Sequence, residues 1–485
     1  MTFPFSRRQF LAENAMGVGG VALAWLLQQE GLLANPTKLN PNSRHHDLKP
    51  RTPPLPAQAT AMISLFQHGG PSHMDLTDPK PELTRRSGTD YTGDIQYSFV
   101  NRASKQLMGS PWKFAPRGEC GTEISELLPH LAEIVDDVCL IRSMHTGANG
   151  HEVSIRYFHG GIPGVLGRPT FGSWLVYGLG SENQNLPAYM VLTDPGGLPV
   201  DGVNNWTNGF MPPLYQGTVL RPKEPRILNL DAPPHLQGEL QQQNLGLLEM
   251  LNRRHLARHP GEPDLEARIA SYELAAGMQT AAREALDISQ ETQATHTLYG
   301  LDREETREYG TRCLIARRLV ERGVRFVQLF HNGQPWDNHS NIASGLPSIC
   351  RRTDQPAAAL VKDLKQRGML DSTIVHWGGE IGRLPVIESQ GDDVSKAGRD
   401  HNGQGFSIWL AGGGIKGGLA YGKTDEFGHK AIENIVTPND FQATLLRQFG
   451  LDYTGLTYNH NGQDQQITNH RPARVVEDIL NRTHS

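Results

Sequence analysis

The sequence predicts an α/β protein in which helices cover both faces of a mostly parallel central sheet. Short apolar runs of strand length recur along the chain, separated by longer stretches with apolar residues at helical spacing. Strand, helix and strand in repeated succession favours parallel pairing, because helices connect parallel strands and pack on the faces of their sheet. The 52 glycines and 32 prolines among 485 residues imply many loops and argue against a helical bundle.

The expected elements follow from these runs. We expect strands at 61–67, 137–141, 187–192, 324–330, 372–377 and 406–411. We expect helices at 264–290, 303–322, 356–367 and 440–449. Ligands of such sheets bind beyond the carboxyl ends of the strands, so the residues that follow these runs are the first candidates for a site.

Composition excludes some classes of function. The formal net charge of −5 gives no excess of cations to neutralise phosphates, which argues against nucleic acid as a partner. None of the four cysteines forms a Cys-x-x-Cys pair, so no cysteine-type zinc site is expected. Cys139 and Cys313 lie in apolar runs, and we interpret them as packing residues.

The N-terminus resembles a twin-arginine (Tat) export signal. Arg7 and Arg8 precede a moderately apolar, glycine-containing stretch that is too short for a membrane span. We therefore expect a signal segment at 1–34, the Tat translocase as a partner, and a periplasmic or cell-envelope location. The alternative is an ordinary basic N-terminus before a helix, and no sharp cleavage site decides between removal and retention as an anchor.

The rest of the chain is expected to be a linker and one large domain. Residues 35–58 are rich in proline, asparagine and basic residues, which is typical of a linker. The domain spans 59–480, with an insertion at about 195–300 that could lie over the site and influence substrate choice. In it, Trp206 and Tyr215 could stack on a sugar, although packing is the commoner role of such rings.

Polar clusters follow the expected strands. They are His68 to Asp75, His145 to Glu152, Asp337 with His339, Glu380, and Arg399-Asp400-His401. Imidazoles and carboxylates from separate segments suit Zn²⁺ or Mn²⁺, and Arg383 or Arg399 could clamp an oxyanion. Each cluster alone could be a turn, a helix start or a surface ion pair. Together, beyond strand ends, they predict a metal site.

Several motifs resemble one family of Tat-exported bacterial proteins, domain of unknown function 1501. They are His68-Gly-Gly-Pro-Ser-His-Met-Asp-Leu-Thr-Asp-Pro-Lys-Pro81, Trp336-Asp-Asn-His339, Gly379-Glu-Ile-Gly-Arg383, Gly398-Arg-Asp-His401, and Gly412-Gly-Gly-Ile-Lys-Gly-Gly-Leu-Ala-Tyr-Gly422 with Thr424-Asp425. The resemblance runs in order from about residue 60 to the C-terminus. It implies the fold of the alkaline phosphatase and sulfatase superfamily.

The resemblance also implies roles for individual residues. Carried over by position, the metal ligands would be His68, Asp337, His339, Glu380 and His401. From the polar clusters we add Asp75 and Asp400 as candidate ligands, and His145 and His151 as residues that would contact substrate. His68 stands where many relatives have Asp, and Glu380 where they often have Asp-His, so the number and identity of metals stay open. Zinc is the expected metal, with manganese or calcium as alternatives.

The nucleophile of such a site would come from the segment after the second strand. Thr146 is the first candidate and Ser143 the second, with catalytic support from Arg383 and Arg399. Both hydroxyls could instead only cap the following turn. No Cys-x-(Pro/Ala)-x-Arg motif occurs, which argues against a formylglycine-dependent sulfatase.

The sequence therefore predicts an exported metal-dependent hydrolase of phosphate or sulfate esters, acting on a small-molecule or carbohydrate ester through Thr146 or a metal-activated water. A non-catalytic exported binding protein on the same fold is the alternative, because fold does not fix function. A phosphomutase- or transferase-type reaction is a third hypothesis. The sequence leaves the oligomeric state open.

Overall fold

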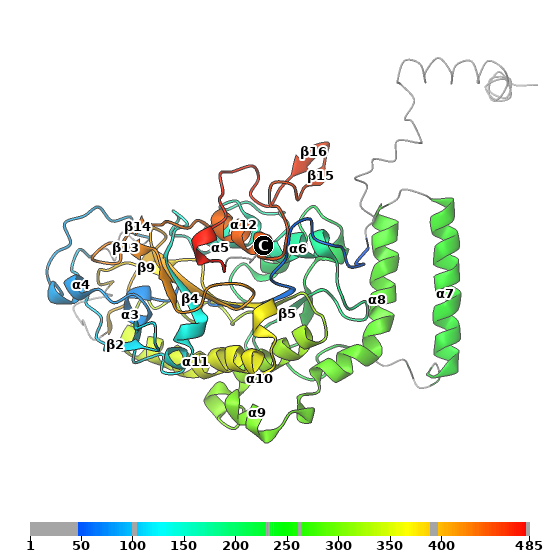
Figure 1. Ribbon diagram of the computed structural model, residues 1–485, viewed down its shortest axis with the longest axis horizontal. Coiled ribbons are helices and arrows are strands. Elements are labelled where there is room, and N and C mark those ends of the chain that lie inside the picture. Colours follow the sequence, from blue (N-terminus) through cyan, green and yellow to red (C-terminus); the bar gives the residue numbers. More distant parts are fainter. Residues whose placement is uncertain are drawn as a thin grey trace, which may run out of the picture. The chain divides into compact units, whose positions relative to one another are not determined.

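A computed structural model describes residues 47–481, apart from 99–103, 229, 231, 232, 234, 236, 260–262 and 389–395 (Figure 1). The expected signal segment and residues 35–46 of the expected linker lie outside this range. Residues 47–58 lie along the domain, where the backbone N–H of Arg51 donates to the carbonyl of Leu179 and that of Leu55 to Gly450. Within the described range, no helix is long and apolar enough to cross a membrane.

The described residues contain an eight-stranded sheet with the strand order β12-β4-β11-β8-β1-β7-β5-β6. Strand β11 pairs antiparallel with β4 and β8, and all the other pairings are parallel. The expected α/β class with a mostly parallel sheet is therefore confirmed. The strands are β1 (Ala61–Phe66), β4 (Val138–Met144), β5 (Tyr189–Leu192), β6 (Thr218–Leu220), β7 (Phe326–Leu329), β8 (Thr373–Gly378), β11 (Phe406–Ala411) and β12 (Leu419–Tyr421).

Helices cover both faces of this sheet (Figure 1). Successive side chains of a strand point to opposite faces, so Ile63 and Leu65 of β1 join one core and Met62 and Phe66 join the other. The first core is shared with α10 (Glu304–Glu321) and α11 (Ile342–Gln366), and the second with α5 (His151–Gly160), α6 (Phe171–Leu179) and α12 (Pro438–Gln448).

Smaller elements extend from the sheet. Short helices are α3 (His73–Leu76), α4 (Pro81–Arg85) and α9 (Gln293–Leu298), and two long ones, α7 (Glu239–Arg258) and α8 (Pro263–Leu286), lie within the expected insertion. Four two-stranded pairs join β2 (Phe114–Arg117) to β3 (Thr122–Ser125), β9 (Gly382–Arg383) to β10 (His401–Asn402), β13 (Lys423–Thr424) to β14 (Ala431–Glu433), and β15 (Tyr458–His460) to β16 (Gln463–Gln465), counted over the described residues.

Some expectations about packing are now decided. Cys139 and Cys313 are buried, which confirms them as packing residues. Trp206 and Tyr215 are also buried in the core, so stacking on a sugar is wrong for these rings and packing is correct. Helix α11 begins at Ile342 and not at Pro356, because its apolar face is already buried from Ile342 onward and the helix continues past both internal prolines.

Candidate metal centre

Loops at one edge of the sheet bring the polar clusters together. His151 is the first residue of α5 and follows β4, whereas Asp337 and His339 follow β7 and Glu380 follows β8. His401 belongs to β10 and comes just before β11. Because β11 runs opposite to its neighbours, its amino end lies at the same edge as the carboxyl ends of the parallel strands.

Three imidazoles and one carboxylate converge at this edge. His151, Asp337, His339 and His401 each offer one ligand atom, and these atoms all lie within 4.8 Å of one another. The Nε2 atoms of His339 and His401 are 2.8 Å apart. Asp337 Oδ1 lies 2.9 Å from His339 Nε2 and 3.1 Å from His401 Nε2, and its Oδ2 lies 3.4 Å from His151 Nε2.

These donors fit a divalent metal. Four ligands around zinc at bond lengths of about 2.0–2.1 Å would be about 3.3 Å apart, which is close to the separations in this cluster. Three neutral imidazoles and one carboxylate are also the ligand types that zinc accepts. Two facing Nε2 atoms cannot both carry a proton at 2.8 Å, whereas both can direct lone pairs at one cation.

Two buried carboxylates fix the orientation of two of these rings. Glu380 Oε1 is 2.6 Å from Nδ1 of His151, and Glu388 Oε2 is hydrogen-bonded to Nδ1 of His339. An ionised carboxylate only accepts, so each Nδ1 carries a proton, and Nε2 is the atom of each ring that faces the cluster and could bind a cation through its lone pair. A carboxylate behind a ligating histidine is a recurrent feature of metal sites, where it fixes the tautomer and raises ligand basicity.

The charges of the cluster are balanced from within. Burial would raise the pKa of Asp337, but the charge of Arg383 and the three neighbouring histidines hold that pKa well below its usual range. Burial lowers the pKa of His151, but Asp337 and Glu380 outweigh it and raise that pKa to about 9. Without a metal, the cluster therefore holds a proton on His151, which a cation has to displace.

Comparison with known proteins places the chain in a family. The model of the family described as "Protein of unknown function (DUF1501)" matches residues 59–480. The chain belongs to the DUF1501 family. This confirms the family that the motifs predicted, and no curated protein matches the chain.

Solved structures that resemble this DUF1501 protein share little sequence with it. The lipoteichoic acid synthase LtaP from Listeria monocytogenes is 8% identical, with a TM-score of 0.33 over 84% of this chain and 77% of that one. The PsFucS1 sulfatase from Pseudoalteromonas sp. is 12% identical, with a TM-score of 0.34 over 90% and 71%. The alkaline phosphatase from the Antarctic bacterium TAB5 is 8% identical, with a TM-score of 0.30 over 78% and 97%.

Other expected ligands of the DUF1501 chain have different partners. His68 is buried with Nε2 3.2 Å from Asn205 Oδ1, and burial lowers its pKa to about 4. Glu380 contacts the cluster through His151. Asp400 accepts the backbone N–H of His401 at 2.7 Å and has Oδ1 4.0 Å from Nδ1 of His339, beside Glu388.

The expected arginines are held by carboxylates. Arg383 places Nη2 2.5 Å from Asp337 Oδ1 and donates to the carbonyls of Gly69, Gly70 and Arg399. Arg399 forms a fully buried pair with Asp75, at 2.8 and 3.1 Å.

The hydroxyls of the two candidate nucleophiles contact main-chain carbonyls, and so does His145. Ser143 donates to Asn434 O at 2.7 Å, and Thr146 lies 3.3 Å from Ala148 O. His145 Nδ1 is 3.2 Å from Gln404 O. Among the hydrogen bonds of the described residues, none joins Ser143, Thr146 or His145 to the four-residue cluster.

Glu388 is a residue that the sequence did not indicate. It follows no predicted strand and belongs to no quoted motif, so only the fold could find it. Its backbone exchanges two hydrogen bonds with Gly398, of 2.9 and 3.0 Å, which fixes it beside His339. A Cβ at Gly398 would lie 2.2 Å from the carbonyl oxygen of Asn338, so this close approach explains the glycine that opens the Gly-Arg-Asp-His motif.

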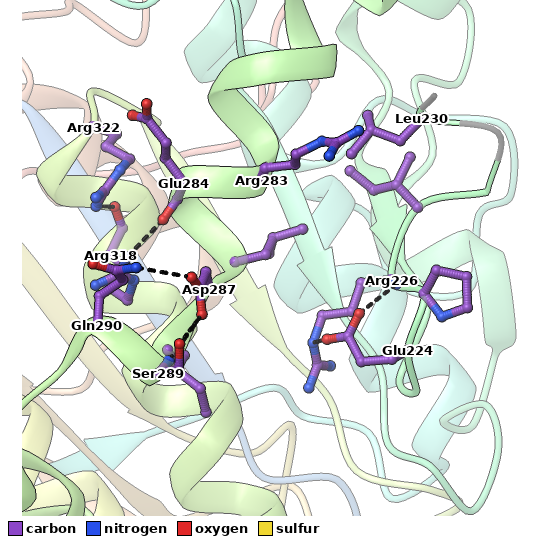
Figure 2. A pocket seen from close by; sticks show the side chains of 14 residues that line it. Glu224, Arg226, Leu230, Arg283, Glu284, Asp287, Ser289, Gln290, Arg318 and Arg322 are labelled. Atoms are coloured by element: carbon purple, nitrogen blue, oxygen red, sulfur yellow. Dashed lines mark hydrogen bonds and ion pairs between the residues drawn. The ribbon is translucent and has the colours of Figure 1, made fainter. Parts of the chain in front are cut away.

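A large cavity lies apart from the cluster. Its volume is about 1100 Å³, and its wall comes from the segment after β6, the end of α8 and α10 (Figure 2). Arg226 is paired with Glu224 at 2.9 Å, and Arg318 is bound to Glu291 and to the carbonyls of Glu284 and Ala285. None of the four cluster residues lines it.

Proposed function

We propose that this protein is a metal-dependent hydrolase of phosphate or sulfate esters, centred on His151, Asp337, His339 and His401. The convergence of three imidazole Nε2 atoms and one carboxylate carries the proposal. Zinc suits this donor set, with manganese or calcium as alternatives. A bound cation would supply Lewis-acid polarisation of an ester oxygen. Small-molecule or carbohydrate esters are the proposed substrates.

The chain's own residues prepare this centre. Glu380 and Glu388 hold the Nδ1 protons of His151 and His339, so that both rings turn Nε2 toward the cluster, where it could bind a cation. Arg383 fixes Asp337 and balances its charge. Because Arg383 and Arg399 are both engaged by carboxylates, we assign them to positioning Asp337 and Asp75.

Water is the nucleophile that this arrangement favours. The hydroxyls of Ser143 and Thr146 are engaged by main-chain carbonyls. Thr146 remains the alternative nucleophile, and its use would require the side chain to turn toward the cluster. A transferase-type reaction would need such a protein nucleophile or a second acceptor, and it is therefore less favoured.

The engaged hydroxyls also favour a second candidate function. A non-catalytic binding protein that holds a metal needs the cluster but no nucleophile. The hydroxyls of Ser143 and Thr146, which are bound to main-chain carbonyls, fit that role. Turnover separates the two candidates. Hydrolysis that needs the metal supports the enzyme, whereas metal and ligand binding without turnover supports the binding protein.

We also propose export through the Tat pathway to the periplasm or cell envelope. Arg7 and Arg8 support it, and because Tat carries folded proteins, the centre could load its metal before export. Replacing both arginines with lysine should leave the protein in the cytoplasm, as cell fractionation would show. Unchanged export of this variant would contradict the proposal.

Metal content is the decisive test of the centre. Elemental analysis of the purified full chain should show a stoichiometric divalent metal, and Asp337→Ala with His339→Ala should remove it. The control is Asp354→Asn, which replaces a buried carboxylate of α11 and should keep the metal. If the folded wild-type protein takes up no zinc, manganese or calcium, the hydrolase proposal is wrong. With metal present, aryl phosphates and aryl sulfates are the first substrates to assay.

A further inference from the structure

Helix α7 (Glu239–Arg258) has none of its described side chains buried. It nevertheless carries more exposed large hydrophobic side chains than any other helix in the described part of the chain: Leu240, Leu245, Leu247, Leu248, Met250 and Leu251. Leu247, Leu248 and Leu251 are 50%, 55% and 48% exposed. Apolar residues gathered on one helix in this way mark an interaction site, whereas scattered ones need no explanation.

Four of these six side chains form a stripe along the helix. Leu240, Leu247 and Leu251 follow the i, i+7, i+11 spacing of one helix face, and Leu248 lies beside them. The contact between α7 and α8 includes Gln241, which hydrogen-bonds Gln279 and lies at the Leu248 edge of this stripe. We call Leu240, Leu247, Leu248 and Leu251 the α7 stripe.

A helix with these properties needs a partner. Most helical stability in proteins comes from packing an apolar face, and α7 has no buried side chain among its described residues. Gly246 in the middle of α7 costs about 1 kcal/mol more than alanine there. The side chains of the α7 stripe stay 46–55% exposed, so packing against α8 leaves about half of their surface in water.

The charges of α7 are unequal along its length. The first half carries Glu239 and no cation, and the second half carries Arg253, Arg254 and Arg258 with Glu249 as its one acid. Two such helices laid antiparallel would bring the acidic end of each against the basic end of the other. A two-fold axis near Leu247 and Leu248 would place both stripes in contact, which is the self-complementary form of a homodimer interface.

We propose that the α7 stripe is a dimer interface and that its occupant is α7 of a second copy of this chain, packed antiparallel. This inference is independent of the proposed hydrolase function. A lipid surface fits less well, because membrane-surface helices carry lysine and arginine along their polar face. Here the first half of α7 has glutamines and asparagine in those positions and α7 contains no lysine.

Sedimentation of the purified full chain over a concentration series tests the proposal. We expect a dimer. Leu247→Glu should raise its dissociation constant by at least about 100-fold, because two charges would enter one apolar contact. Gln242→Glu adds the same charge to the side of α7 that carries Glu249 and Arg253, and it should leave the dimer intact. Equal circular dichroism spectra and equal thermal unfolding midpoints at low protein concentration would show that the domain is folded in both variants.

Cysteine cross-linking tests the antiparallel direction. In a Cys120→Ser background, which removes the exposed native cysteine, Leu247→Cys lies near the two-fold axis and should form an intermolecular disulfide. Leu240→Cys would face the other end of the partner helix, about 22 Å from its counterpart, and should not. Cross-linking of both positions would overturn the antiparallel arrangement.

Two further outcomes would overturn the interface itself. One is a monomer at every concentration, or a dimer that Leu247→Glu leaves intact. The other is a monomer that binds vesicles of phosphatidylcholine and phosphatidylglycerol through Leu247, which would assign the stripe to a lipid surface.

Discussion

The metal cluster and helix α7 depart from ordinary protein surfaces and interiors in opposite ways. The cluster buries charged and polar groups, and α7 exposes leucines to solvent. In the cluster every buried charge has a partner at hydrogen-bonding distance, supplied by four or more separate segments. In α7 the leucines of the stripe keep about half of their surface in solvent. Buried polar groups and exposed apolar stripes are both informative, because each costs free energy unless something else compensates it.

The largest expected effect concerns the buried pair behind the cluster. Arg399 and Asp75 are both fully buried, so Arg399→Met would leave an uncompensated carboxylate in the interior. We expect a loss of about 3–5 kcal/mol in the free energy of unfolding, measured by urea denaturation. The double variant Asp75→Leu with Arg399→Met should recover much of the loss. A cost below about 1 kcal/mol for the single variant would show that the pair is not confined as described.

The contribution of Asp354 to stability should depend on pH in the opposite sense to that of Asp337. Asp354 accepts the N–H groups of His130 and Leu131, and its burial raises its pKa to about 7. The unfolded chain releases this proton near pH 4. The folded protein keeps it up to pH 7, so this group lowers stability as pH rises between these values.

Asp354 should lower the free energy of unfolding by at most about 1.4 kcal/mol for each pH unit. Thermal denaturation of Asp354→Asn beside the wild type should show this decline only in the wild type. Parallel curves for the two proteins would exclude the raised pKa.

An intermediate effect is expected at Glu388. Glu388→Gln keeps the size of the side chain but removes the charge that fixes the tautomer of His339. Zinc affinity, measured by competition with a chelator, should fall about 10–100-fold while the metal-free protein keeps its stability. A merely structural role would lower that stability and leave the affinity unchanged. Asp354→Asn is the matched control, because Asp354 lies outside the cluster and should leave zinc affinity unaltered.

The smallest effect is expected on α7. Leu251→Gln should change the unfolding free energy by less than about 0.5 kcal/mol at low protein concentration, because the side chain contacts solvent there. At high concentration the same substitution should cost more, if association stabilises the fold. A large cost that does not depend on concentration would show that Leu251 packs within its own chain.

The sequence predicted the long buried elements best. The apolar runs became β1, β4, β5, β7, β8 and β11, because side chains buried on both faces leave a continuous apolar signal. The edge strands β6 and β12 are too short for such a signal. The sequence did not indicate helix α6, because all its residues are buried and no amphipathic period is present. The sequence did not indicate helix α5 either, because it begins at His151 directly after a glycine-containing loop.

The site was predictable only in part. Asp337, His339 and His401 were expected as ligands and lie together in the cluster. His151 was expected to bind substrate, and the structure places it among the potential ligands. Glu380 was expected as a ligand and hydrogen-bonds His151 instead. Sequence shows which residue types follow strands, but it does not show which of them face one another across several loops.

The reversed strand β11 has a consequence for how the centre would take up a ligand. His401 pairs with Arg383 in the β9–β10 ladder, and β11 begins a few residues later, so the segment between them is tethered at both ends. Such a segment has little conformational entropy left to lose. An imidazole held in place in advance would let an ion bind without first ordering a loop, and slow dissociation would be the expected kinetic signature.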